Sequence, residues 1–177
     1  MRSILVVIGT RPEIIKAMPV IRELERWGNY TLVWSGQHFS YEMSRVFFEE
    51  LKLPEPHVYL DIPAEGDLLE RVLMMVAKIK AFIRSNRDEI VAVYALGDTA
   101  TTLAAGIASV YEGVPFIHDE AGMRSYDLSM PEEVNRRVAD AIAFMHFAPT
   151  KLAYYNLLME GADKTHLYLV GSIVVDA

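Results

Sequence analysis

The sequence lacks several residue types and motifs that assign a chemistry on their own. Its 177 residues contain no cysteine, which excludes disulfide bonds, thiolate nucleophiles and cysteine-ligated zinc or iron–sulfur sites. No G-x-G-x-x-G and no G-x-x-x-x-G-K-[ST] occurs, so the dinucleotide fingerprint and the P-loop are both absent. The five histidines show no metal-ligand spacing, and we single out only His38 and His118 for attention. We therefore predict no metal and no cofactor.

Long apolar runs and an excess of positive charge are also lacking. The apolar run at residues 4–8 is far too short to span a bilayer, and no cleavage site of a signal peptide follows it. Lys plus Arg is 17 against 24 Asp plus Glu, and this net charge of -7 argues against general binding of nucleic acid. We expect a cytoplasmic protein with no membrane or nucleic-acid partner. A local basic site for one anionic ligand stays open.

Short apolar runs alternate with helical patterns along the chain, and 52% hydrophobic content suffices for one domain with a full core. The expected strands cover residues 4–8, 31–34, 90–94, 114–117, 143–147 and 167–170. The expected helices cover residues 14–24, 67–84 and 101–111, and residues 54–66 are expected to be a loop. This order predicts an α/β fold with an open parallel sheet and helices on both faces.

Two of the expected helices carry further predictions. Pro19 should kink or restart the first helix. The second should bury one apolar face made of Leu69, Val72, Leu73, Val76, Ile79 and Ile83.

Charged residues gather where the expected strands end. The clusters are Gly9-Thr10-Arg11-Pro12-Glu13 with Lys16, Gly97-Asp98-Thr99, His118-Asp119-Glu120-Ala121-Gly122 with Arg124, and Pro131-Glu132-Glu133 with Asn135 and Arg136. The carboxyl ends of parallel strands share one edge of a sheet, so we expect the four clusters to meet in one crevice.

The first cluster has the features of an anion site. Gly9 allows a tight turn, Arg11 can bind phosphate with two hydrogen bonds, and Pro12 suits the first turn of a helix whose free N–H groups favour anions. The alternative is an ordinary strand-to-helix connection with a solvated arginine. The four residues from Gly9 to Pro12, taken alone, favour that alternative.

Three carboxylates are candidates for proton transfer. Taken singly, Asp98 is explained as a helix N-cap, and Glu120 and Glu132 as acids that favour a helix dipole. Taken together at one edge of the sheet, beside Arg11, Lys16, Arg124 and Arg136, they would perturb each other's pKa values. Such a pocket is suited to acid–base chemistry.

Six motifs together resemble one known family. They are Gly9 to Lys16, Gly36-Gln37-His38, Gly97-Asp98-Thr99, Glu120 to Arg124, Pro131 to Arg136, and Gly171 to Ala177. In this order, from end to end of the chain, they resemble the UDP-N-acetylglucosamine 2-epimerases of the non-hydrolysing type.

The resemblance implies a fold and a reaction. The fold would be one half of a two-domain glycosyltransferase B architecture, with residues 1–171 as an N-terminal Rossmann-like domain and residues 172–177 as the start of the hinge to a missing C-terminal domain. The reaction would interconvert UDP-N-acetylglucosamine and UDP-N-acetylmannosamine by elimination of UDP to a glycal intermediate and its re-addition. A homodimer, active in building cell-surface polysaccharide, is a further expectation.

The resemblance also implies residue roles. Arg11 and Lys16 would lie near the diphosphate, and the acid and base candidates are Asp98, Glu120 and Glu132. The substrate-binding set is completed by Gln37, His38, Arg124 and Arg136.

The sequence departs from the family pattern at a few positions. Asp119 replaces a usual valine and Met123 a usual leucine, while residues 125–130 are shorter than in bacterial members. Residues 39–43 also differ from the bacterial pattern that holds a second, allosteric UDP-sugar, so allosteric activation is not predicted. Two alternatives to the epimerase stay open: a non-catalytic module that binds a UDP-sugar or dimerises through residues 67–84, and a glycosyltransferase of the same architecture.

Overall fold

The computed structural model describes residues 2–36, 46–63 and 66–177. Its strands are β1 (Ser3–Ile8), β2 (Tyr30–Trp34), β3 (Val58–Tyr59), β4 (Ile90–Leu96), β5 (Phe116–Asp119), β6 (Met145–Ala148) and β7 (Leu167–Leu169). They form one sheet in the order β3-β2-β1-β4-β5-β6-β7, and every neighbouring pair is parallel. The predicted open parallel sheet is confirmed.

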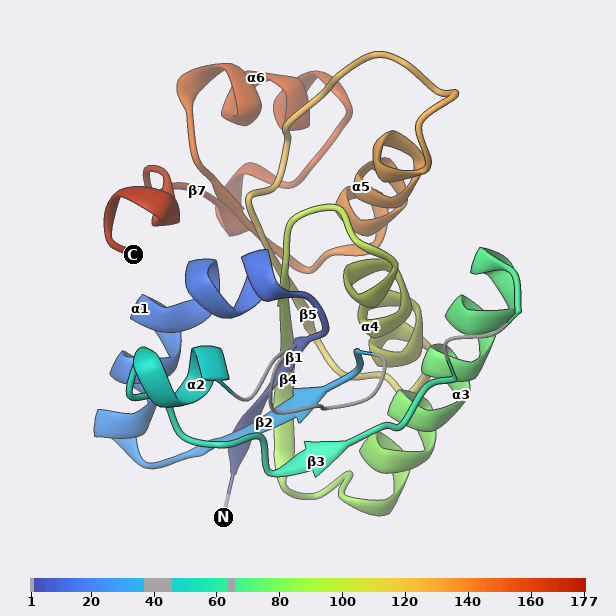
Figure 1. Cartoon of the computed structure of the whole chain (residues 1–177). Helices are drawn as coiled ribbons and strands as arrows, with labels where there is room; N and C mark the ends of the chain where they lie inside the picture. Colours follow the sequence, from blue (N-terminus) through green and yellow to red (C-terminus); the bar gives the residue numbers. More distant parts are fainter. Residues whose placement is uncertain (1, 37–45, 64–65) are drawn as a thin grey trace.

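Helices cover both faces of this sheet (Figure 1). They are α1 (Arg11–Trp27), α2 (Val46–Glu50), α3 (Leu68–Ser85), α4 (Ala100–Tyr111), α5 (Pro131–Ile142) and α6 (Lys151–Met159), with 3₁₀ turns at Lys164–His166 and Ile173–Val175. One apolar core packs Ile14 of α1 and Phe48 of α2 on the sheet. The other packs Ile79 of α3 and Ala104 of α4 on the opposite face. The predicted Rossmann-like α/β class is therefore confirmed.

The strand order reverses at the centre of the sheet. Because β1 lies next to β4, the chain leaves these two strands in opposite directions, towards β2 on one side and β5 on the other. Ligands of open α/β sheets bind in the crevice that such a reversal leaves at the carboxyl ends of the strands. The turns after Ile8 and Leu96 lie at this point.

Several boundaries differ from the sequence predictions. β5 begins at Phe116, two residues later than predicted, because Pro115 has no N–H to donate to the ladder and contributes only its carbonyl, which accepts from Val93 N–H at 2.9 Å. β6 likewise begins at Met145 rather than at residue 143. The predicted loop 54–66 contains the short edge strand β3, which pairs with β2.

Two predictions about helices were wrong in part. Pro19 lies inside the continuous helix α1 and does not restart it, since packing of Met18 and Ile21 on either side outweighs one lost hydrogen bond. The buried stripe of α3 is Val72, Met75, Ile79 and Ile83. Leu69 and Leu73, predicted to be buried, are 65% and 59% exposed.

None of the helices within the described ranges has the length and apolar character needed to cross a membrane. The predicted division at residue 171 stays a prediction.

Candidate active site

A buried glutamate joins the two turns at the centre of the sheet. Glu13, in the first turn of α1, accepts hydrogen bonds from the backbone N–H groups of Gly9 and Thr10 at 2.8 and 2.7 Å. Its other oxygen accepts from the hydroxyl of Thr99 at 2.6 Å. Burial raises the pKa of Glu13, and these donors act against that rise. The carboxyl group thus holds the turn after β1 against the turn after β4.

Lys16 and Glu120 form the first charged pair at the crevice. Lys16 lies one turn further along α1 than Glu13, and its Nζ is 2.8 Å from Oε2 of Glu120. The Glu120 side chain, which follows β5, is only 10% exposed. A Cβ built on Gly97 would lie 3.4 Å from the same oxygen, so the carboxylate rests against the turn after β4.

Asp98 and Arg136 form the second charged pair. Nη2 of Arg136 donates to Oδ2 of Asp98, and the Asn135 side chain donates to the Asp98 carbonyl at 3.0 Å. The alternative reading of Asp98 as the N-cap of the next helix was wrong. Thr99 caps α4, accepting from the N–H of Thr102 at 3.3 Å, so the Asp98 carboxylate remains for Arg136. We call Lys16–Glu120 and Asp98–Arg136 the crevice pairs.

Glu120 has an unusual backbone conformation. Its φ is 58°, in the left-handed region that disfavours side chains with a Cβ. The preceding Asp119 accepts from the Glu120 N–H at 2.7 Å and from the Tyr94 hydroxyl at 2.6 Å. Burial raises the pKa of both Asp119 and Tyr94. Glu120 follows a strand and leads into a loop, so the reading of it as an acid in the first turn of a helix was wrong. Backbone strain of this kind gathers at functional sites.

Glu132 and Glu133 are adjacent in the first turn of α5 but differ in their surroundings. Glu132 is exposed, and its carboxylate makes no hydrogen bond or ion pair within the described ranges. Pro131 opens the helix as the sequence predicts, and Glu132 suits its dipole. Glu133 is fully buried and accepts from the N–H of Ser125 at 2.8 Å and from Arg137 Nε at 2.9 Å. Burial alone would raise the pKa of Glu133, but these donors hold it down at about 2.

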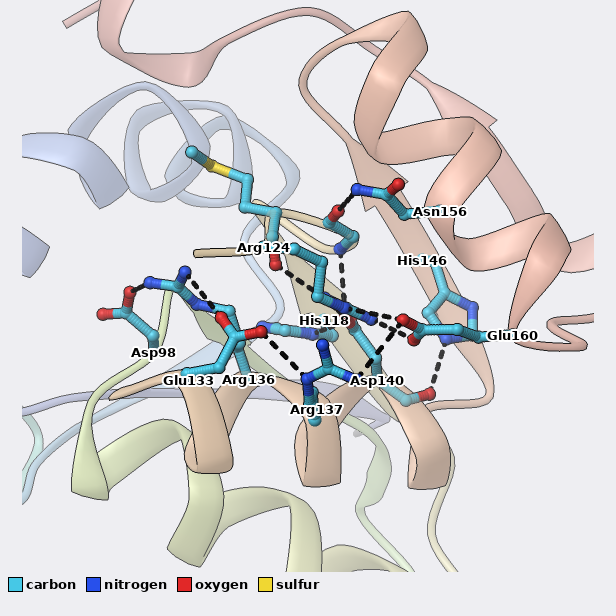
Figure 2. A network of polar contacts seen from close by, with 12 residues as sticks. Asp98, His118, Arg124, Glu133, Arg136, Arg137, Asp140, His146, Asn156 and Glu160 are labelled. Atoms are coloured by element: carbon cyan, nitrogen blue, oxygen red, sulfur yellow. Dashed lines mark hydrogen bonds and ion pairs between the residues drawn. The ribbon is translucent and has the colours of Figure 1, made fainter. Parts of the chain in front are cut away.

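Arg124 lies in a buried network behind the crevice (Figure 2). Its Nη1 is 2.6 Å from Oδ2 of Asp140, and its Nη2 donates to Glu160. The Arg124 side chain is 0% exposed, so it supports the loop rather than facing the crevice. Its predicted contact with substrate stays a prediction. His118, also 0% exposed, places Nδ1 2.7 Å from Oδ1 of Asp140.

We call Glu133 and Asp140, with the side chains that donate to them, the buried acid cluster. Arg136 connects it to the crevice, since Nη1 donates to Glu133 at 3.2 Å while Nη2 donates to Asp98.

Arg11 is exposed and lines a pocket of ≈ 350 Å³ on the β2 side of the crevice. Its guanidinium is 5.6 Å from the centre of the Phe47 ring. Arg71 of α3 and the first turns of α1 and α4 also line this pocket. Two arginines and two helix N-termini suit an anionic ligand.

Two predicted binding residues, Gln37 and His38, lie outside the described residues. Within the described ranges, no group of three or more His, Asp or Glu residues could hold a metal ion.

Sequence reasoning assigned no role to Glu13, Glu133 or Asp140, which are all buried. The sequence carried no clear signal for Asp140, because the buried side of α5 is mostly polar, with Glu133, Asn135 and Asp140 beside Ala139. Nothing in the sequence identifies Arg124 and His118 as its partners.

Comparison with known proteins identifies the family. A family model described as UDP-N-acetylglucosamine 2-epimerase matches residues 22–177. The UDP-N-acetylglucosamine 2-epimerase of Methanococcus maripaludis is 42% identical over 179 residues, covering 100% of this chain and 47% of that protein. The chain belongs to the UDP-N-acetylglucosamine 2-epimerase family. The resemblance inferred from the six motifs is thus confirmed.

Other members of this family widen the comparison. The UDP-2,3-diacetamido-2,3-dideoxy-D-glucuronate 2-epimerase of Pseudomonas aeruginosa is 38% identical over 181 residues, covering 99% of this chain and 50% of that protein. The crystal structure of the Methanocaldococcus jannaschii UDP-GlcNAc 2-epimerase in complex with UDP-GlcNAc and UDP superposes with a TM-score of 0.90 at 38% identity, over 97% of this chain and 47% of the other.

A more distant structure, MurG of Acinetobacter baumannii, matches with a TM-score of 0.62 at 12% identity and shares the fold alone. The chain spans about half the length of the curated relatives it matches, which fits the predicted half of a two-domain architecture.

Proposed function

We propose that this chain is the N-terminal half of an isomerase that interconverts UDP-N-acetylglucosamine and UDP-N-acetylmannosamine. In the forward step the C2–H bond and the C1–O bond to UDP break, a C1–C2 double bond forms, and UDP leaves. In the return step UDP adds to C1 and a proton adds to the opposite face of C2. The chemistry therefore needs a base, an acid and a cation near the leaving diphosphate.

The crevice pairs carry this proposal. Asp98 follows β4 at the reversal of the sheet, and Glu120 follows the neighbouring strand β5. Each is held by a cation, Arg136 or Lys16. A carboxylate held in one place can take or return a proton at C2, while Lys16 can neutralise charge on the departing diphosphate once substrate enters.

Glu132 is the third acid–base candidate and the most accessible. It lies one helical turn before Arg136 on α5, so it stands near the Asp98 end of the crevice. Its exposure leaves it free to meet substrate or the second domain. We assign Arg11 to the diphosphate because it lines this pocket together with the N-termini of α1 and α4.

Exchange of solvent deuterium into C2 tests the proposal. The protein that carries this chain with its second domain should convert UDP-N-acetylglucosamine to its C2 epimer in D₂O and label C2 as it does so. The diacetamidoglucuronate nucleotide, the substrate class named for the Pseudomonas relative, should be offered in parallel. Labelling of the diacetamidoglucuronate nucleotide alone would support the proposed reaction but show that the proposed substrate is wrong. Transfer of the sugar to an acceptor, without labelling, would favour a glycosyltransferase.

The 177-residue chain alone should not turn over. The crevice then has one wall only, so water is not excluded and substrate is not fixed. We expect its affinity for UDP to be no tighter than about millimolar, or about 4 kcal/mol, by calorimetry. Epimerisation by the chain alone, followed by NMR, would contradict the requirement for a second domain.

A homodimer through α3, in the cytoplasm, completes the proposal. Leu69 and Leu73 are more than half exposed and lie one turn apart on this helix, so they form an apolar strip available to a second copy. The double substitution Leu69→Lys, Leu73→Lys should then give a monomer in light scattering. An unchanged mass would show that the dimer contact does not involve this strip. A two-domain protein that forms a dimer but does not turn over would favour the non-catalytic module.

A further inference from the structure

His118 is buried between two hydrogen-bond acceptors. Its Nε2 lies 2.8 Å from the carbonyl oxygen of Gly97, and its Nδ1 lies 2.7 Å from Oδ1 of Asp140. A carbonyl oxygen can only accept, so Nε2 carries a hydrogen. The remaining question is which partner holds the proton between Nδ1 and Asp140.

The surroundings of Asp140 answer this question. Its Oδ2 accepts from Nη1 of Arg124 at 2.6 Å and from the N–H of Gly122 at 3.0 Å. Arg124 is a permanent cation, and both it and the Gly122 N–H can only donate, so these two partners alone favour the ionised form of Asp140. Asp140 is therefore a carboxylate, and the proton lies on Nδ1. His118 carries hydrogen on both nitrogens and is an imidazolium inside the protein.

The other ring nitrogen of His118, Nε2, contacts the turn that carries Asp98. Besides Glu13, three side chains linked to α5 hold this turn: His118 through the Gly97 carbonyl, Asn135 through the Asp98 carbonyl, and Arg136 through the Asp98 carboxylate. Asn135 and Arg136 belong to α5, and His118 is tied to the same helix through Asp140 (Figure 2). The turn is thus fixed to one helix at three points.

We propose that His118 is a positioning residue, protonated on both ring nitrogens, which fixes the Gly97–Asp98 turn so that the Asp98 carboxylate is correctly oriented. Its importance for turnover rests on the proposed function. The protonation state and the anchoring of the turn do not, so each part has its own measurement.

The protonation state is tested on the chain as it is. With ¹⁵N-labelled histidine, both ring nitrogens of His118 should give the shifts of protonated nitrogens at pH 8, where free histidine is neutral. His146 is the internal comparison, since it is also buried and, within the part of the chain that the structure describes, only its Nε2 has a partner, the Asp140 carbonyl at 2.8 Å. A shift typical of an unprotonated nitrogen at His118 would overturn the assignment.

Two substitutions separate the contacts of the ring. His118→Gln keeps a donor near the position of Nε2, facing the Gly97 carbonyl, whereas His118→Asn keeps one near Nδ1, facing Asp140. Both remove the charge and leave a buried amide. Positioning predicts that His118→Asn lowers kcat by about 10²-fold with little change in KM, and that His118→Gln retains most of the activity.

The matched control is His146→Gln, which alters a buried histidine beside the same aspartate but away from the turn. It should lower the melting temperature without changing kcat. Equal kcat values in His118→Asn, His118→Gln and His146→Gln would show that His118 only supports the fold.

Hydrogen exchange of the Gly97 amide measures how firmly the turn is held and does not depend on enzyme activity. This amide donates to the Asp119 carbonyl at 3.0 Å. Exchange should be faster in His118→Asn than in His118→Gln, and equal rates would reject anchoring. If the two-domain wild type neither epimerises nor labels C2, the proposed function fails while these measurements still decide the role of His118.

The pH dependence provides an independent check. Burial lowers the pKa of His118, but Asp140 and the Gly97 carbonyl outweigh it and raise the pKa overall. The stabilisation from the folded imidazolium is thus complete below the unfolded pKa of about 6.5 and is lost as pH rises through the higher folded value. The charged and titratable groups around it are Asp119 on β5, Asp140 on α5, Arg124 in the loop, His146 on β6 and Glu160 after α6.

His118→Gln should flatten the decline in melting temperature above that pH, relative to His146→Gln. An unchanged decline in His118→Gln would show that another of these groups titrates.

Discussion

The crevice pairs and the buried acid cluster both pair carboxylates with cations, but we propose that the first serve the reaction while the second holds the fold. In both, carboxylates face arginine or lysine. At the crevice, the side chains of Asp98 and Glu120 are 34% and 10% exposed, and each carboxylate forms one ion pair within the part of the chain that the structure describes. In the cluster, Glu133 and Asp140 are at most 3% exposed along their side chains and have several donors each. Exposure together with the number of donors, rather than residue type, separates the acids proposed to react from the acids that hold the scaffold.

The largest expected effect lies at the crevice. In the two-domain protein, Glu120→Gln should lower the rate of epimerisation by about 10²- to 10⁴-fold, because the amide can neither take nor give a proton. Asp98→Asn and Glu132→Gln should be compared in the same deuterium-exchange assay. Melting temperatures should stay close to that of the wild type. If the three acids only support the structure, the amides would instead lose about 1 to 3 kcal/mol of stability through lost hydrogen bonds and keep full exchange rates.

The next effect lies in the buried acid cluster. Asp140→Asn should reduce the free energy of unfolding by about 3 to 5 kcal/mol, because Arg124 and His118 lose their shared buried counter-charge. Urea unfolding of the 177-residue chain measures this. A loss below 1 kcal/mol would mean that water reaches the network and that the two regions differ less than their geometry indicates.

The pH response of Glu133 sharpens the same comparison. Its pKa of about 2 lies below that of an unfolded glutamate, about 4.3, so the folded state favours the ionised form. This stabilisation is complete above the unfolded value and is lost as pH falls from about 4.3 towards 2. Thermal melting between pH 5 and pH 2 should show a steep fall in the wild type and a shallower one in Glu133→Gln. Parallel curves would assign the acid sensitivity to other carboxylates.

The smallest effect is expected at the outer partner of Arg124. Glu160 is 40% exposed, so its ion pair with Arg124 is screened by water. Glu160→Gln should change the free energy of unfolding by only about 0 to 1 kcal/mol. Asp140→Asn serves as its matched comparison, because both acids pair with the same guanidinium. Equal losses from the two changes would remove burial as the deciding factor.

The sheet could be predicted because its central strands are buried on both faces. Runs such as Ile4–Ile8 and Ile90–Tyr94 are almost continuously apolar, and the turn residues Gly9 and Gly97 mark their ends. The convergence of the motifs on one edge follows from parallel pairing alone. The residues at which strands begin could not be predicted from apolar content, because they depend on details such as the missing N–H of Pro115.

The candidate site could be predicted in part. The crevice pairs join residues from motifs that the sequence had already singled out. Which carboxylate pairs with which lysine or arginine was not predictable. Lys16 and Glu120 are 104 positions apart, and Asp98 and Arg136 are 38 apart. The buried acid cluster was missed because a charged residue on a helix is normally read as solvated, and only the folded chain supplies its partners.

The left-handed backbone of Glu120 places stability and chemistry in competition at one position. Glycine adopts this conformation freely, whereas another residue in it costs about 1 to 3 kcal/mol. Glu120→Gly would relax the backbone while removing the carboxylate that faces Lys16. A screen for heat resistance alone should therefore accept glycine at position 120, and a screen for turnover should reject it. Design for thermal stability should therefore leave Glu120 unchanged. An acid can be kept at this point of the crevice only in the strained backbone conformation.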